Sequence, residues 1–173
     1  MKAIDIVIPV INEAQNVAEL CRRIHASFVR SGWEYRCIFI VDPSNDGTFE
    51  VIEKLSATYP ITVRHKQGKP GKAYSIVEGV ALATTEYVTM IDGDLQYPPE
   101  AIPDMLKLTP QHGVVIAERK VREGSLIRRI VSLCGAYLVG KLLLRLVYDI
   151  QSGLKVFRRD IVAHIDPNVI YGW

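Results

Sequence analysis

Short apolar runs alternate with longer amphipathic segments through the first half of the chain. Four runs rich in β-branched residues predict strands at residues 3–11, 35–41, 61–66 and 87–92. The segments between them have helical periodicity and predict helices at residues 12–32, 46–60 and 71–83. In the first helix, Asn12 is expected to cap the start, Glu13 lies in the first turn, and Gly32 can end it.

This alternation predicts an α/β fold with a mostly parallel sheet covered by helices on both faces. In open sheets of this kind, ligands bind beyond the carboxyl ends of the strands. The four segments that follow the strands are polar or rich in Gly and Pro: "PVINE", "DPSNDGT", "KQGKPGK" and "DGDLQ". We therefore expect these segments to face a single crevice.

The pattern changes after Pro98 and Pro99. A short helix at 99–108, a strand at 113–119 and a long helical stretch at 124–149 are predicted, followed by a turn and a short strand or helix within 151–165. We interpret residues 1–173 as one domain with two halves, 1–98 and 99–173.

Composition narrows the functional classes. The formal charge of +2 over 173 residues is too small to indicate a nucleic-acid-binding protein. Three cysteines without CxxC spacing argue against a disulfide framework or a structural zinc site, and fit a reducing compartment. The first residues do not resemble a signal peptide. Lys141 and Arg145 lie within the longest apolar stretch, 130–148, and argue against a single membrane-spanning helix.

Asp92 and Asp94 follow the fourth predicted strand in "MIDGDLQYPPE". The pair could form a turn, since Asp-Gly is a common turn sequence. Two carboxylates this close repel each other, however, and a divalent cation bound between them would attract both and offset that repulsion. Oxygen ligands suit Mg²⁺ or Mn²⁺, and substrate phosphates commonly complete the coordination of such an ion.

The motifs in their order along the chain resemble those of family-2 glycosyltransferases with the GT-A fold. They are "IVIPVINEAQNV", "IVDPSNDGT", "GKPGKAYSIVEG", "MIDGDLQYPPE", "AERK" and "DIQSGLKVFRR". Within that family they are most similar to the dolichyl- or polyprenyl-phosphate sugar synthases. The family implies a nucleotide-diphosphate sugar donor of the GDP-mannose or UDP-glucose type, a polyprenyl or dolichyl phosphate acceptor, and Mg²⁺ or Mn²⁺ as cofactor.

The resemblance makes 1–98 the nucleotide-sugar-binding half and 99–173 the acceptor-side half, and it assigns roles to individual positions. The donor nucleotide would be bound by Pro9, Ile11, Glu13, Asp42, Lys72 and Asp92. The metal would be held by Asp92, Asp94 and Gln96. The acceptor phosphate would be held by Arg119, Arg128 and Ser132, so that the catalytic set is Asp92, Asp94 and Arg119. The family's D-x-x-S-G turn and its trailing basic residue correspond to Asp149, Ser152, Gly153 and Arg158.

Several of these residues also have simpler structural explanations. Pro9 can end a strand, Glu13 can favour a helix start, and Asp42 can cap a turn. Arg128 and Ser132 lie four residues apart, so on a helix they share a face and could hold one phosphate, or form a solvated helix start. The segment from Arg119 to Arg129 contains several basic residues and a single acid, Glu123. Its positive charge suits binding to an anionic lipid phosphate or to a membrane surface.

The resemblance implies a metal-dependent, inverting transfer at the cytoplasmic face of a membrane, with the protein peripherally associated. A phosphate acceptor is already anionic and needs no general base; for a hydroxyl acceptor in polysaccharide or cell-envelope synthesis, Asp149 is the candidate base. A nucleotidyltransferase would have a Gly-rich basic loop after the first strand, but "PVINEAQN" contains neither glycine nor a basic residue. A processive synthase would have a Q-x-x-R-W motif, which these residues lack. A non-catalytic or truncated nucleotide-sugar-binding module is a further alternative.

Two departures from the family pattern bear on these expectations. The segment "DPSNDGT" is one residue shorter than the family's second-strand motif, and Pro43 replaces its second aspartate. Family members also continue well past Trp173, so we expect the chain to lack the C-terminal part of the family's sequence.

Overall fold

The structure is a computed structural model that describes residues 2–118 and 152–162. Its strands are β1 (Lys2–Val10), β2 (Trp33–Val41), β3 (Ile61–His65), β4 (Tyr87–Ile91), β5 (Val114–Ile116) and β6 (Leu154–Arg158). Its helices are α1 (Val17–Phe28), α2 (Thr48–Leu55), α3 (Lys72–Leu82), the 3₁₀ turn η1 (Pro99–Ala101), α4 (Ile102–Leu108) and α6 (Arg159–Val162). The predicted helical stretch 124–149 lies outside the described residues.

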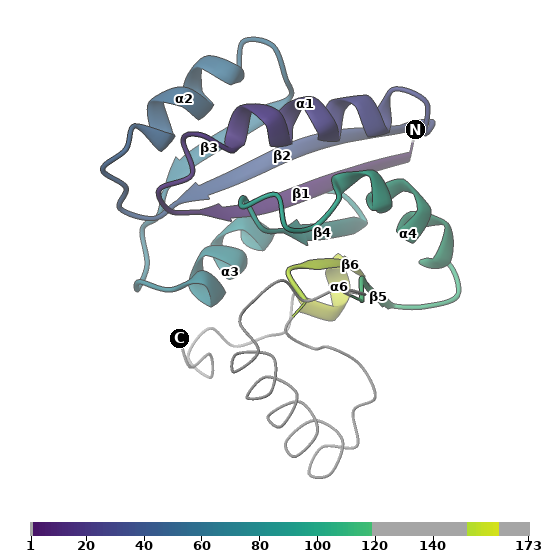
Figure 1. The fold of residues 1–173 in the computed structure, drawn as a ribbon. Coiled ribbons are helices and arrows are strands. Elements are labelled where there is room, and N and C mark those ends of the chain that lie inside the picture. Colours follow the sequence, from purple (N-terminus) through teal and green to yellow (C-terminus); the bar gives the residue numbers. More distant parts are fainter. Residues whose placement is uncertain (1, 119–151, 163–173) are drawn as a thin grey trace, which may run out of the picture.

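The six strands form one sheet in the order β3-β2-β1-β4-β6-β5 (Figure 1). The first four strands run parallel, as the alternation of strands and helices predicts. β6 is antiparallel to β4 and to β5, so the second half of the chain adds a mixed edge to the sheet. The expected mostly parallel α/β fold is therefore confirmed.

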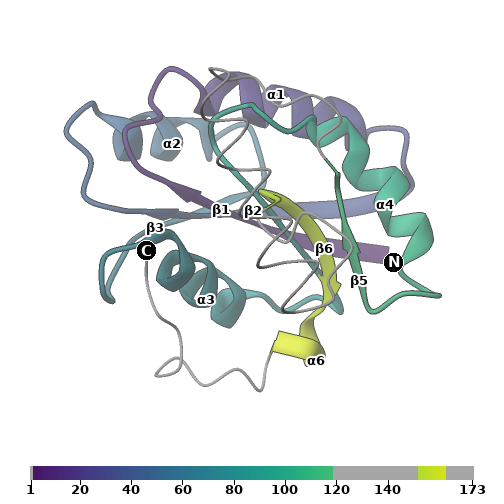
Figure 2. The same cartoon turned by 60° about the horizontal axis from the view of Figure 1, so that its bottom comes forward.

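Helices cover both faces of the sheet (Figures 1 and 2). The sheet has a hydrophobic cluster on each face, and alternate residues of β1 point into one or the other. Ile4, Ile6 and Ile8 belong to the cluster that includes α1, whereas Val7 belongs to the cluster that includes α3. The α1 side shows the expected helical spacing, with Leu20 and Ile24 fully buried. This arrangement directs the carboxyl ends of four parallel strands toward one edge.

The start of α1 differs from the sequence prediction. The helix begins at Val17 and Asn16 is its N-cap, so the expected capping role of Asn12 is wrong. Asn12 instead adopts a φ of +54°, and its side-chain oxygen accepts a hydrogen bond from the N–H of Asn45 at 3.0 Å. α1 also ends at Phe28, four residues before Gly32, whose φ of +74° turns the chain into β2.

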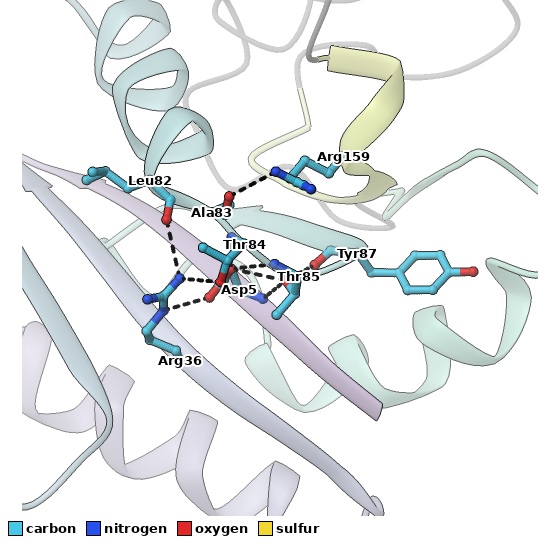
Figure 3. Close-up of polar contacts among 8 residues, drawn as sticks. All are labelled: Asp5, Arg36, Leu82, Ala83, Thr84, Thr85, Tyr87 and Arg159. Carbon is cyan, nitrogen blue, oxygen red and sulfur yellow. Dashed lines mark hydrogen bonds and ion pairs between the residues drawn. The ribbon is translucent and has the colours of Figure 1, made fainter. Parts of the chain in front are cut away.

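A buried carboxylate joins three elements at the amino edge of the sheet (Figure 3). Asp5 of β1 is 1% exposed and accepts hydrogen bonds from Arg36 Nε at 2.8 Å and from the N–H groups of Thr84 and Thr85 at 2.6 and 3.1 Å. Burial alone would raise the pKa of Asp5, but these donors together hold it below its ordinary value. The contact fixes the connection between α3 and β4 to β1 and β2.

Cys21 and Cys37 are core residues. Burial raises the pKa of Cys21 to about 12 and that of Cys37 well above its ordinary value, so neither is a thiolate at neutral pH. Cys134 lies outside the described residues. In the described ranges, no helix has both the length and the apolar character needed to cross a membrane.

Candidate active site

A cleft of about 510 Å³ lies at the carboxyl edge of the parallel strands. Its lining comes from the carboxyl ends of four strands and the segments after them: Pro9 and Val10 at the end of β1, with Ile11 and Glu13 after it; Asp42 and Pro43 after β2; Pro70, Gly71 and Lys72 after β3; and Asp92, Gly93 and Asp94 after β4. The prediction that four polar strand ends face one crevice is confirmed. We refer to this space as the carboxyl-edge cleft.

Asp92 is enclosed by contacts from two distant segments. Its backbone N–H donates to the carbonyl of Gly153 at 3.1 Å, and Lys72 Nζ lies 2.5 Å from its Oδ1. Gly153 packs so closely that a Cβ there would lie 2.6 Å from Asp92 Cγ and 2.8 Å from Tyr97 Cε2. The Ser-Gly turn before β6 therefore shapes the surroundings of the first aspartate.

The oxygen chemistry around Asp92 and Asp94 fits a divalent cation. Asp92 Oδ1 is buried and accepts no hydrogen bond from the part of the chain that the structure describes; the Lys72 ammonium forms an ion pair with it. Asp94 lines the same cleft, and its Oδ1 accepts the N–H of Gln96 at 3.1 Å. The described residues contain no cluster of three or more acidic, His or Cys side chains, so a metal here would need substrate or water oxygens as further ligands.

The Gln96 side chain is exposed and is not among the described residues that line the cleft. Its observed contact is the backbone hydrogen bond to Asp94, which orders the turn after β4. The structure thus brings Asp92 and Asp94 together at the cleft but does not bring the Gln96 side chain into it.

The loops after β1 and β2 are held together by four cross-connections. The N–H of Glu13 donates to Thr48 Oγ1 at 2.9 Å, and that of Ala14 donates to Asp46 Oδ2 at 3.0 Å. Hydrogen bonds from Asn12 to Ser44 and from Asn45 to Asn12 complete the set. The Thr48 hydroxyl and the Ala14 N–H hold the pKa of Asp46 below its usual value. The shortened "DPSNDGT" segment thus still forms an ordered wall, with Pro43 in the lining.

Glu13 combines a structural contact with a position in the cleft. Its carbonyl accepts the N–H groups of Asn16 and Val17, and its Oε2 accepts Asn16 Nδ2 at 2.6 Å, which orders the approach to α1. Ile11, on the same wall, is 55% exposed. An exposed apolar side chain beside a polar cleft offers a flat contact for a ring.

Asp42 is held by two residues that sequence reasoning missed. Lys66 Nζ lies 3.1 Å from Oδ1 and 3.2 Å from Oδ2 of Asp42, and Ser75 Oγ donates to Oδ2 at 2.7 Å. The register Val41↔His65 places Asp42 and Lys66 level after neighbouring parallel strands. The sequence does place an acid, Asp42, and a base, Lys66, directly after two predicted strands. Only the register between β2 and β3 shows that the two side chains meet.

Residues 5–166 match the family profile described as Glycosyl transferase family 2. The chain belongs to this family. It is 30% identical over 96% of its length to a dolichol-phosphate mannosyltransferase of Pyrococcus furiosus, covering 49% of that relative. It is 28% identical over 94% of its length to a dodecaprenyl-phosphate galacturonate synthase of Rhizobium johnstonii, again covering 49%. The chain thus spans about half the length of these curated relatives.

The fold of this family-2 glycosyltransferase is that of the GT-A enzymes. A crystal structure of glucosyl-3-phosphoglycerate synthase from Mycobacterium tuberculosis, in complex with Mn²⁺, UDP-glucose and phosphoglyceric acid, superposes with a TM-score of 0.72 at 20% identity. The match covers 95% of this chain and 59% of that one. The expected family and fold are therefore confirmed.

The remaining predicted residues of the glycosyltransferase fall into two groups. Ser152 is buried, and its hydroxyl contacts the backbone of Leu154, so it stabilises the turn that presents Gly153. Arg158 lies at the opposite end of β6, level with Tyr87, and forms an ion pair with Asp160 at 2.6 Å. The structure does not bring Arg158 to the cleft. Four predicted residues lie outside the described ranges: Arg119, Arg128, Ser132 and Asp149.

Proposed function

We propose that this chain transfers a sugar from a nucleotide-diphosphate sugar to a polyprenyl or dolichyl phosphate. The observation that carries the proposal is the carboxyl-edge cleft, which gathers Asp92, Asp94 and Lys72 beside the ends of four parallel strands. The names of the two curated relatives, which act on dolichol phosphate and dodecaprenyl phosphate, support the acceptor class.

In this proposal the donor lies along the cleft. Pro9, Ile11, Glu13 and Asp42 form the nucleoside end, because the first two offer apolar contacts and the carboxylates accept hydrogen bonds from base or ribose. Lys72 and Asp92 form the diphosphate end. The Lys72 ammonium that now faces Asp92 can also pair with a phosphate oxygen.

Asp92 and Asp94 would hold Mg²⁺ or Mn²⁺ at the diphosphate, with Gln96 able to contribute if its exposed side chain turned inward. The relative solved with UDP-glucose contains Mn²⁺. A bound divalent cation supplies charge neutralisation for the departing nucleoside diphosphate. The chain's own contribution is to fix the two carboxylates, Asp92 through Gly153 and Asp94 through the N–H of Gln96.

The acceptor phosphate would be held by Arg119, Arg128 and Ser132. β5 ends at Ile116, and β6 begins at Leu154. Leu154 is paired with Ile91, the last residue of β4, so the described chain leaves the sheet after β5 and returns to it at β6 on the edge that borders the cleft. A phosphate oxygen would attack the anomeric carbon as the bond to the diphosphate oxygen breaks, and the electron pair would leave with the nucleoside diphosphate. The result is a single displacement with inversion, without a dedicated base.

The acceptor lipid places this reaction at a membrane surface. The basic residues from Arg119 to Arg129 would attract anionic headgroups, which gives peripheral association with the cytoplasmic face. Sedimentation with vesicles containing anionic lipid should therefore show binding that weakens as salt is raised.

The test compares Asp94→Ala with Asp104→Ala in a transfer assay with GDP-mannose or UDP-glucose, Mn²⁺ and polyprenyl phosphate. Asp104 is an exposed carboxylate on α4, paired with Lys107, and serves as the matched control. Loss of one metal-holding group should reduce transfer on the order of 100-fold or more, as for other electrostatic groups in active sites. Undiminished transfer in Asp94→Ala would contradict the proposal. Donor binding without transfer by the unaltered chain would instead support a nucleotide-sugar-binding module.

A further inference from the structure

Lys66 is a buried cation that the proposed chemistry does not use. Its side chain is 2% exposed, although it directly follows an edge strand, β3. Its ammonium contacts the Asp42 carboxylate, donates to the Gly71 carbonyl at 2.6 Å and donates to Ser75 Oγ at 2.8 Å. These three partners match the three donors of an ammonium group.

The partners of Lys66 belong to the two walls of the carboxyl-edge cleft. Asp42 follows β2 on one wall, whereas Gly71 precedes α3 and Ser75 lies in its first turn on the other. Ser75 is fully buried and donates to Asp42 Oδ2 at 2.7 Å, which closes the network. Among the described residues, the lining of the cleft includes Asp42 and Gly71 but neither Lys66 nor Ser75.

We propose that Lys66 and Ser75 are positioning residues for the donor, acting through Asp42 and the start of α3; this inference rests on the proposed function. Gly71 is followed by Lys72, which pairs with Asp92, so a continuous set of contacts runs from Asp42 at the nucleoside end to Asp92 at the diphosphate end. The ammonium sets the separation of the two ends of the donor site without touching the donor.

Charge gives Lys66 a second effect on the donor. Asp42 is 8% exposed, and a carboxylate this buried needs a partner. Lys66 compensates its negative charge inside a cleft that must accept an anionic diphosphate. Without Lys66, the uncompensated Asp42 carboxylate would repel the donor and would be held less firmly, by Ser75 without the ammonium.

The experiment titrates the full chain with UDP and GDP in the presence of Mn²⁺, and measures donor KM and kcat separately. Lys66→Met keeps the length of the side chain and removes its charge, and Arg64→Met removes a charge from an exposed side chain of β3, the strand that Lys66 follows. We expect Lys66→Met to weaken nucleotide binding and raise donor KM on the order of 10- to 100-fold, with kcat within about threefold, because misplacement rather than chemistry is affected. Arg64→Met should match the unaltered chain.

Two further variants keep the inference testable if Lys66→Met does not fold. Ser75→Ala removes one arm of the network and should raise donor KM in the same direction by a smaller factor. In the background of Asp42→Asn, Ser75→Ala should have little additional effect on KM, because residues that act through one partner are not additive.

The outcomes separate the two proposals. If the unaltered chain binds neither nucleotide, the proposed function fails and this inference fails with it. If the unaltered chain binds but Lys66→Met and Ser75→Ala bind equally well, the inference alone is overturned. A fall in kcat with unchanged KM would likewise overturn it, since a group that positions the donor must act on binding.

Discussion

At the scale of single residues, the backbone at Gly153 closely approaches the first aspartate. A methyl group there would overlap Asp92 Oδ2 and lie 2.8 Å from Tyr97 Cε2. The carboxylate would have to rotate, and the proposed metal would lose one of its two aspartate ligands.

We predict that Gly153→Ala lowers Mn²⁺-dependent nucleotide affinity about tenfold or more, since displacement of a ligand by about 1 Å has effects of this size. The measurement is a calorimetric titration with UDP or GDP. Gly113→Ala is the matched control, because its added methyl meets only the flexible end of Ile161. Equal affinity in both variants would mean that Asp92 does not need its present orientation.

At the scale of elements, α3 is held at both ends. Its start is tied to β2 through Lys66 and Ser75, and the connection that follows its end is tied to β1 and β2 through Asp5 (Figure 3). Since Lys72 is the first residue of α3, the position of the whole helix decides where that ammonium lies in the cleft.

The Asp5 contact gives a prediction about pH. Its pKa is lower in the folded than in the unfolded chain, so its stabilisation is present above the unfolded value of about 4 and is lost as the pH falls through the folded pKa. Asp5→Asn should cost about 2 kcal/mol of unfolding free energy at pH 7, the cost of leaving buried donors unsatisfied, and this deficit should shrink below about pH 4.

Urea denaturation of Asp5→Asn and of the unaltered chain at pH 7, 4 and 3 checks this prediction. Asp160→Asn, which alters an exposed carboxylate, should behave like the unaltered chain at pH 7. A deficit that stays constant from pH 7 to pH 3 would show that the charge of Asp5 is not what stabilises the connection.

At the scale of the whole molecule, periodicity was sufficient to predict the four parallel strands, because strands buried on both faces are nearly continuous apolar runs, but it left β6 undecided between a strand and a helix. It also predicted the cleft, since the carboxyl ends of parallel strands share an edge. It did not predict Lys66 against Asp42, which depends on the register between β2 and β3, nor the end of β1, where Asn12 joins a neighbouring loop instead of capping α1. Both depend on contacts between segments distant in sequence.

The same scale gives a test of the donor and the metal together. A ligand that binds only the folded chain stabilises it by about 2.7 kcal/mol at 100 times its Kd. For a chain of this size that amounts to a rise in Tm of roughly 5–11 °C. We predict such a rise for UDP or GDP with Mn²⁺, and a much smaller one with EDTA, because the Lys72 ammonium, which is paired with the Asp92 carboxylate, leaves the diphosphate charge only partly neutralised without the cation.

Asp92→Asn should abolish most of that rise, whereas Asp104→Asn should retain it, because Asp104 is an exposed carboxylate that pairs with Lys107 on α4. Measurements with Mn²⁺ and with EDTA distinguish the contribution of the metal from that of the nucleotide. An equal rise with EDTA would contradict metal dependence while leaving nucleotide binding intact. A full rise with Mn²⁺ alone would mean that the carboxylates bind the cation without the nucleotide, and that the cleft does not select a diphosphate donor.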